Sequence, residues 1–182
     1  MHAVEILFAV GWGVFWLYWL IAAFSMKRGH VPWSREIGIR VVIVVIAIAL
    51  AHAGVFRDRG MNTAAWRAGL GLAIFVGGLA FAVWARLHLG RNWGTPMTRK
   101  EEPELVTSGP YRLVRHPIYS GILVAGIGTA VALIWLWLLA VLLVGAYFVY
   151  SATVEERYMT ERFPDSYPGY KRSTKMLVPF VF

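Results

Sequence analysis

Residues 109–121 carry the densest group of reactive side chains in the sequence, directly before a long apolar run. They read Gly-Pro-Tyr-Arg-Leu-Val-Arg-His-Pro-Ile-Tyr-Ser-Gly. Pro117 has no backbone donor and a fixed φ, so it suits the first turn of a helix, while His116 before it is driven toward an extended conformation. The free N–H groups and positive dipole end of that helix would then face the polar residues and favour an anionic group. The pattern predicts a ligand site at a membrane surface.

A second group of polar side chains follows the last apolar run. Helical spacing places Glu155, Met159 and Arg162 near one face. A carboxylate at a membrane surface beside aromatic rings suits a cationic or hydroxyl-bearing ligand, because rings attract cations and the carboxylate accepts hydrogen bonds. We expect this group and residues 109–121 to meet on one side of the membrane.

Two charged residues of these groups have alternative interpretations. For Glu156 the simplest expectation is a solvated charge near a helix end, with a ligand contact as the alternative. Arg115 suits a contact with lipid phosphate at least as well as a role in the site.

The elements that must position these groups are membrane-spanning helices. The chain has 182 residues, is 58% hydrophobic and only 15% charged, and has a mean hydropathy of +0.58. The run 118–150 would form a helix of about 50 Å, longer than one bilayer, so it predicts two spans that turn near 133–137. Stretches of suitable length predict spans at residues 3–25, 37–56, 68–89, 118–133 and 135–152. In the third span, small residues would allow close helix packing, namely Gly69, Gly71, Gly77 and Gly78.

The sequence therefore predicts an all-α polytopic membrane protein of a single domain. About five transmembrane helices are expected, the last two forming a hairpin, with a small cap made of residues 90–117 and 154–182. Basic residues gather after the first, third and fifth spans, which predicts that the cap and the C-terminus face the cytoplasm. The expected location is the inner or cell membrane of a bacterium or archaeon.

Composition argues against several other classes of site. The net charge of +8 lies beside the spans, as anionic lipid favours, and no basic face with interleaved aromatics indicates nucleic-acid binding. The chain has no cysteine, and its five histidines are scattered, so no metal site is expected. The expected partners are the lipid bilayer and a lipophilic substrate, and the oligomeric state is left open.

The cap motifs, in their order and spacing, resemble the isoprenylcysteine carboxyl methyltransferase family of integral membrane enzymes. The resemblance covers about residues 87–182, and its motifs lie at residues 89–93, 105–111, 115–121, 155–156 and 163–170. It implies an enzyme that uses S-adenosylmethionine as methyl donor and a lipophilic or membrane-delivered acceptor. By position in the family motifs, the donor contacts are Pro103, Glu104, Leu105, Val106, Tyr111, His116, Pro117, Ile118, Tyr119 and Glu155.

The resemblance also assigns the reacting end of the site. Arg115, His116 and Tyr119 are the candidate catalytic residues, and Ser151, Glu156 and Arg162 are candidate acceptor contacts. Where carboxyl methyltransferases of this family carry an arginine, four residues before Glu155, this chain has Ser151. Because of that departure, the resemblance supports the reaction type better than it supports an isoprenylcysteine-type carboxylate as acceptor.

Three alternatives to that acceptor and activity remain open. The first is a phospholipid methyltransferase that acts on an amine headgroup. The second is a reductase of the sterol reductase type, which would bind a nicotinamide cofactor. The third is a non-catalytic membrane component, which would be expected to carry more polar residues in its spans.

Overall fold

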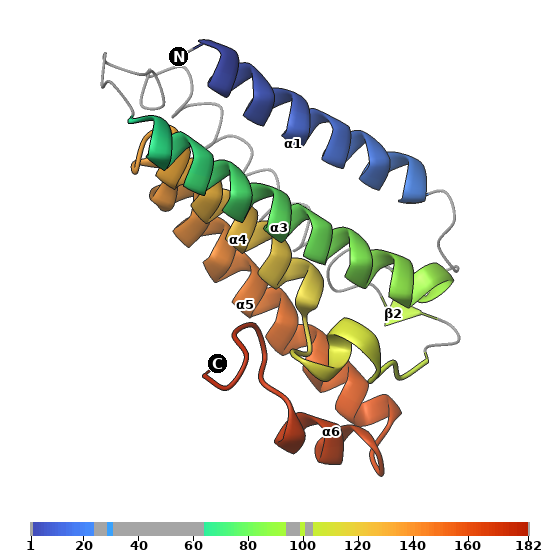
Figure 1. The fold of residues 1–182 in the computed structure, drawn as a ribbon. Coiled ribbons are helices and arrows are strands. Elements are labelled where there is room, and N and C mark those ends of the chain that lie inside the picture. The colour runs from blue at the N-terminus through green and yellow to red at the C-terminus, as the bar shows by residue number, and fades with distance from the viewer. Residues whose placement is uncertain (1, 24–28, 31–63, 94–98, 101–103, 182) are drawn as a thin grey trace.

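Long apolar helices run alongside one another through most of the molecule (Figure 1). The computed structural model describes residues 2–23, 29–30, 64–93, 99–100 and 104–181. The long helices are α1 (His2–Ala23), α3 (Ala65–Leu89), α4 (Pro117–Ala132) and α5 (Trp137–Arg162). Shorter elements are the 3-10 helices η1 (Gly90–Asn92) and η2 (Gly109–Arg112), the helix α6 (Tyr167–Ser173), and the two-residue antiparallel strands β1 (Gly29–His30) and β2 (Arg99–Lys100).

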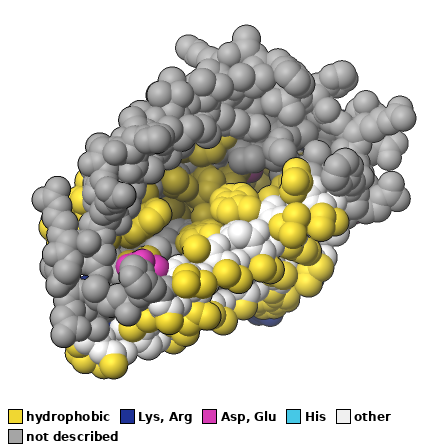
Figure 2. All heavy atoms as spheres, turned by 90° about the horizontal axis from the view of Figure 1, so that it is seen from above, with side chains coloured by type: hydrophobic (Ala, Val, Ile, Leu, Met, Phe, Trp, Pro, Cys, Tyr) yellow, Lys and Arg dark blue, Asp and Glu magenta, His cyan; other side chains and the backbone are white. Residues whose placement is uncertain are grey.

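The described helices confirm the predicted all-α polytopic membrane protein. By length and composition, Ala3–Ala22, Ala65–Leu89 and Trp137–Arg162 are able to cross a membrane, and Pro117–Ala132 is a shorter apolar helix. Hydrophobic side chains cover much of the visible face of these helices (Figure 2). The predicted second span, residues 37–56, lies outside the described residues.

The predicted hairpin is confirmed, with one extension. Helix α4 ends at Ala132 and α5 begins at Trp137, so the turn lies where the length of the apolar run required it. Helix α5 continues past the predicted end of its span, residue 152, as far as Arg162. The two acidic residues at 155 and 156 therefore belong to a regular helix that emerges from the apolar layer.

Helices α3 and α4 approach each other at glycines. A Cβ placed on Gly78 would lie 2.5 Å from the backbone nitrogen of Ala125, and one placed on Gly128 would lie 2.5 Å from that of Phe75. Gly71 makes a similar approach to the carbonyl oxygen of Gly128. The expected close packing is thus confirmed for Gly71 and Gly78. No described residue lies within 4 Å of a Cβ placed on Gly69 or Gly77, so close packing at these two positions stays a prediction.

Arg86 joins the ends of α1 and α3. Its side chain is buried, donates from Nη2 to the Ala22 carbonyl at 2.9 Å and from Nη1 to the Gly90 carbonyl at 2.7 Å, and lies 4.6 Å from the centre of the Trp93 ring. These carbonyls lie at helix ends, where backbone oxygens lack helical partners, so the guanidinium satisfies them.

One end of the helix bundle collects the polar elements. The ends of α1, α3 and α5 and the start of α4 lie there, together with η2 and α6 (Figure 1). After α6 the chain returns to the start of α4: Arg115 N–H donates to the Lys175 carbonyl at 2.8 Å, and His116 N–H donates to the Met176 carbonyl at 3.1 Å. This arrangement brings residues 114–116, the end of α5 and residues 174–177 together.

Candidate active site

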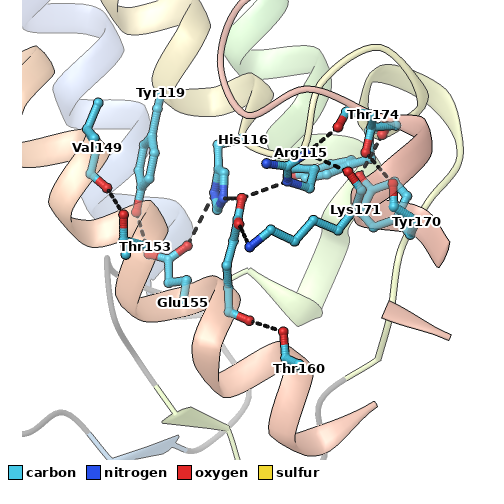
Figure 3. Close-up of polar contacts among 12 residues, drawn as sticks. Arg115, His116, Tyr119, Val149, Thr153, Glu155, Thr160, Tyr170, Lys171 and Thr174 are labelled. Atoms are coloured by element: carbon cyan, nitrogen blue, oxygen red, sulfur yellow. Dashed lines mark hydrogen bonds and ion pairs between the residues drawn. The ribbon is translucent and has the colours of Figure 1, made fainter. Parts of the chain in front are cut away.

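Tyr119, His116 and Glu155 form the centre of the candidate site. The Tyr119 hydroxyl donates a 2.5 Å hydrogen bond to Oε1 of Glu155, and His116 Nδ1 lies 3.5 Å from Oε2 of the same carboxylate (Figure 3). The Tyr119 ring stacks between the His116 ring, at 5.4 Å, and the Phe148 ring, at 4.3 Å. Helices α4 and α5 thus bring together the two motifs that the sequence predicted would meet.

Sequence and fold explain why these side chains meet. Pro117 starts α4, as predicted, and His116 precedes it with non-helical dihedral angles of −124° and 62°. Tyr119 then lies in the first turn of α4, facing α5. Tyr119 and its neighbour Phe148 belong to a buried cluster with Phe15, Ala82, Ile122, Ala152 and Leu177.

The carboxylate of Glu155 is partly accessible. Its side chain is 26% exposed, whereas that of His116 is 11% exposed. An anionic group that is held by a tyrosine hydroxyl and still reaches the surface is suited to accept hydrogen bonds from a ligand or to attract a cation.

Glu156 lies in a different environment from the one expected. Its side chain is 2% exposed, so the prediction of a solvated helix-end charge is wrong. Its Oε1 accepts from Arg115 Nε at 2.6 Å, and its Oε2 lies 2.7 Å from Lys171 Nζ (Figure 3). Helix α5 turns about 100° per residue, so adjacent glutamates face different surroundings, and α6 supplies the cation that permits the burial of the second one.

Arg115 is a structural cation within the protein. Besides Glu156, it donates from Nη1 to the carbonyl groups of Thr174 and Lys171. The expected contact with lipid phosphate is therefore wrong, because the side chain is only 8% exposed and is directed inward. Neither Lys171 nor Thr174 was predicted, since only the return of the chain after α6 brings them here.

His116 lies between the two carboxylates. Burial alone would disfavour its charged form, but Glu155 and Glu156 outweigh burial and raise the pKa of His116 above its ordinary value. Its Nε2 lies 3.5 Å from Oε1 of Glu156, without hydrogen-bond geometry to any described residue. The two carboxylates therefore favour the protonated, positively charged form of the imidazole.

Two tyrosines close the outer wall of the site. The Tyr170 hydroxyl donates to the Tyr111 carbonyl at 2.6 Å and so joins α6 to η2. Burial raises the pKa of Tyr170 to about 12, and burial raises the pKa of Tyr111 as well. Both side chains stay neutral at physiological pH and act as rings and hydrogen-bond donors.

The remaining predicted donor contacts lie in the segment before η2 and in the first turn of α4. Glu104 is held at its backbone by the Asn92 side chain, which donates to its carbonyl at 2.7 Å. Leu105 and Val106 are half-buried, Pro117 is buried, Ile118 is half-buried, and Pro103 lies outside the described residues. These positions remain predictions as ligand contacts.

The candidate acceptor residues differ in their surroundings. Ser151 is fully buried on α5, one turn before Glu155, and its hydroxyl has no hydrogen-bond partner among the described residues. Arg162 is exposed at the last residue of α5. It lies about two helical turns beyond Glu155, near the same face of α5, as the spacing predicted.

Comparison with known proteins shows which family the chain resembles. The family model described as phospholipid methyltransferase matches residues 66–166, more than half of the chain. Protein-S-isoprenylcysteine O-methyltransferase B of Arabidopsis thaliana is 32% identical over 127 residues, which are 67% of this chain and 64% of the relative. The cobalt-zinc-cadmium resistance protein CzcN of Cupriavidus metallidurans is 30% identical over 161 residues, 87% of this chain and 70% of that protein.

A third relative matches a shorter stretch of the chain. Protein-S-isoprenylcysteine O-methyltransferase of Schizosaccharomyces pombe is 34% identical over 85 residues, 46% of this chain and 36% of the relative. The chain thus spans less than two thirds of the isoprenylcysteine methyltransferases it matches. Since the family match contains α3, α4 and α5 with His116, Tyr119 and Glu155, the chain is an integral membrane protein of the phospholipid methyltransferase family, and its predicted kinship with isoprenylcysteine carboxyl methyltransferases is confirmed.

Proposed function

We propose that this protein is a membrane methyltransferase that uses S-adenosylmethionine to methylate a lipophilic acceptor delivered from the bilayer. The observation that carries the proposal is the cluster of Tyr119, His116 and Glu155 where the apolar helices meet the cap. It combines an accessible carboxylate, stacked rings and a helix start in one place. The proposed orientation has this end facing the cytoplasm, which the basic residues beside the spans support.

The residues fit the methyl donor. S-adenosylmethionine carries a sulfonium, an amino group, a carboxylate and ribose hydroxyls. Glu155 would accept from the amino group or the ribose, the rings of Tyr119 and Tyr111 suit the sulfonium, and the start of α4 suits the carboxylate. The guanidinium of Arg115 donates to Glu156 and to backbone carbonyls. Its proposed role is therefore to position His116, which lies beside the same Glu156, and not to contact a reactant.

Methyl transfer would occur directly from donor to acceptor, without a covalent intermediate on the protein. The acceptor lone pair forms a bond to the methyl carbon while the carbon–sulfur bond breaks, and its electron pair returns to sulfur. Tyr119 and His116 would hold the Glu155 carboxylate in place, and the aromatic cluster around Phe148 would exclude water from the reacting end. A carboxylate acceptor loses no proton, whereas an ammonium acceptor must first be deprotonated.

Two acceptor classes follow from the findings. A prenylated thioether carboxylate is the first candidate, because several of the chain's relatives are named for isoprenylcysteine methylation. An amine phospholipid is the second, because Ser151 supplies a neutral, buried hydroxyl where an acceptor carboxylate would need a cation.

Binding of the donor product tests the proposal directly. Purified protein in lipid nanodiscs should bind S-adenosylhomocysteine in a calorimetric titration, and Glu155→Gln and Tyr119→Phe should each weaken the affinity about tenfold, the equivalent of one charge-assisted contact. Matched controls are Glu161→Gln and Tyr150→Phe, since both side chains are exposed on α5. The absence of both a binding heat and a thermal shift at millimolar ligand would refute the proposal.

Product chemistry separates the acceptors. With tritiated methyl donor, a prenylated thioether carboxylate yields a base-labile methyl ester, and phosphatidylethanolamine yields a base-stable methylamine. Donor binding without transfer to either class would retain the site and reject both acceptors.

A further inference from the structure

The chain after α6 forms a short apolar segment that returns to the helix bundle. We call residues 175–181 the return segment. Its start is fixed by the backbone hydrogen bonds from Arg115 and His116, and its Leu177 carbonyl accepts from the Ser120 hydroxyl at 2.6 Å. The Leu177 side chain is 6% exposed and packs in the cluster that contains Tyr119 and Phe148. The return segment is therefore part of the wall of the candidate site.

The last part of the return segment exposes apolar side chains. Val181 N–H donates to the Val178 carbonyl at 3.2 Å and closes a turn. Within this turn Val178 is 49%, Phe180 93% and Val181 74% exposed. Phe180 also has a φ of 66°, which is uncommon for a bulky residue. A strained turn that presents three apolar side chains outward is unfavourable in water.

The position of the turn indicates its surroundings. The Leu177 carbonyl accepts a hydrogen bond from Ser120 in the first turn of α4, and the Leu177 side chain packs in the same cluster as Phe148 on α5. The segment turns back from α6 toward α5 (Figure 1), and Leu177 packs against it in the buried cluster. The exposed turn therefore lies where the apolar spans give way to the polar cap, the level of the boundary between lipid headgroups and acyl chains.

Charge supports the same surroundings. Arg172 and Lys175 precede the turn and both are exposed. Exposed cations followed by apolar side chains are the combination that binds an anionic bilayer surface, the cations at the phosphates and the apolar groups below them.

We propose that the turn Val178–Val181 inserts into the headgroup–acyl boundary of an anionic bilayer. Arg172 and Lys175 contact the lipid phosphates, and the inserted turn holds the return segment against His116 and Tyr119. The lipid surface thus acts as a partner that completes the wall of the site.

Spin labelling tests the insertion without reference to activity. The chain has no cysteine, so Phe180→Cys carries a single nitroxide in the full-length protein, reconstituted in nanodiscs that contain phosphatidylglycerol. We expect the label to collide more often with oxygen than with a water-soluble nickel chelate, as at the lipid-facing Leu142→Cys. Ser173→Cys on α6 should show the reverse. Leu142 is 68% exposed on α5, and Ser173 is exposed on α6.

Several outcomes would overturn the proposal. A label at 180 that behaves like the one at 173 places the turn in water. Dipolar broadening between labels, with low access to both reagents, assigns the turn to a second copy of the chain. Val178→Cys serves as a second site should the change at Phe180 impair folding.

The role of the cations has its own measurement. In nanodiscs of phosphatidylcholine alone, or with Arg172→Gln and Lys175→Gln together, the label at 180 should become more accessible to nickel. The label at 142 should not change. An unchanged depth at 180 in both conditions would contradict the contact with lipid phosphate.

Discussion

Glu155 and Glu156 are adjacent on α5, yet their carboxylates serve different parts of the structure. The Glu155 side chain is 26% exposed and accepts a hydrogen bond from the Tyr119 hydroxyl. The Glu156 side chain is 2% exposed and forms ion pairs with Arg115 and Lys171. The first is placed to meet a ligand, and the second joins the start of α4 to α5 and α6. Four further predictions follow from this and related contacts.

Glu156→Gln should destabilise the protein strongly. The change leaves the Arg115 guanidinium buried without its counter-charge, and losing one partner of a buried ion pair costs about 3–5 kcal/mol. Thermal unfolding followed by tryptophan fluorescence, in the same nanodiscs, measures the effect. Glu161→Gln, an exposed position on the same helix, should leave the midpoint within the error of wild type. Equal midpoints for the two variants would show that the network of Glu156 is not stabilising.

Stability should depend on pH through His116. Its pKa is raised in the folded state, so the stabilisation it gives is fully present below the ordinary imidazole value of about 6.5 and is lost as pH rises through the folded pKa. The difference in unfolding temperature between wild type and His116→Asn should therefore shrink as pH rises from about 6 to 9. A difference that is constant or grows over this range would contradict the protonated imidazole between Glu155 and Glu156.

Gly78→Ala should weaken the packing of α3 on α4. Its new Cβ would lie 2.5 Å from the Ala125 nitrogen, and such overpacking costs about 1–3 kcal/mol. Gly77→Ala is the matched control one residue away, since no atom of the described residues lies within 4 Å of its Cβ position. Thermal unfolding should separate the two variants. Equal unfolding temperatures would mean that the two helices shift apart at little cost.

Arg86→Lys should loosen the junction of α1 and α3. A single ammonium group cannot reproduce the planar fork that donates to Ala22 and Gly90 while stacking on Trp93. We expect a loss of about 1–3 kcal/mol, as for a buried acceptor left unpaired. The loss is measured as a drop in unfolding temperature and as faster proteolysis of the folded protein, both in nanodiscs. Arg162→Lys, at an exposed position, should change neither.

The sequence predicted the parts of the fold that depend on local or bulk properties. Pro117 determines the start of α4 through its own covalent geometry, and the length of the apolar run determines the turn between α4 and α5. The meeting of His116 with Glu155 followed from two motifs that flank one helical hairpin.

What the sequence did not reveal depends on partners far along the chain. Nothing local distinguishes Glu156 from Glu155, and only Arg115 and Lys171 make the burial of Glu156 possible. In the same way, Gly71 and Gly78 differ from Gly69 and Gly77 only in facing α4. Helical periodicity separates faces but does not state which of them meets a neighbour.

The glycine contacts between α3 and α4 also leave no gap between these two helices for a lipid chain. Backbone atoms of the two helices touch around Gly71 and Gly78, so a hydrocarbon chain has no passage there. Under the proposed function, a lipophilic acceptor that moves in the plane of the membrane would have to pass between a different pair of helices to reach Glu155, and the α3–α4 contact would stay fixed while it did so.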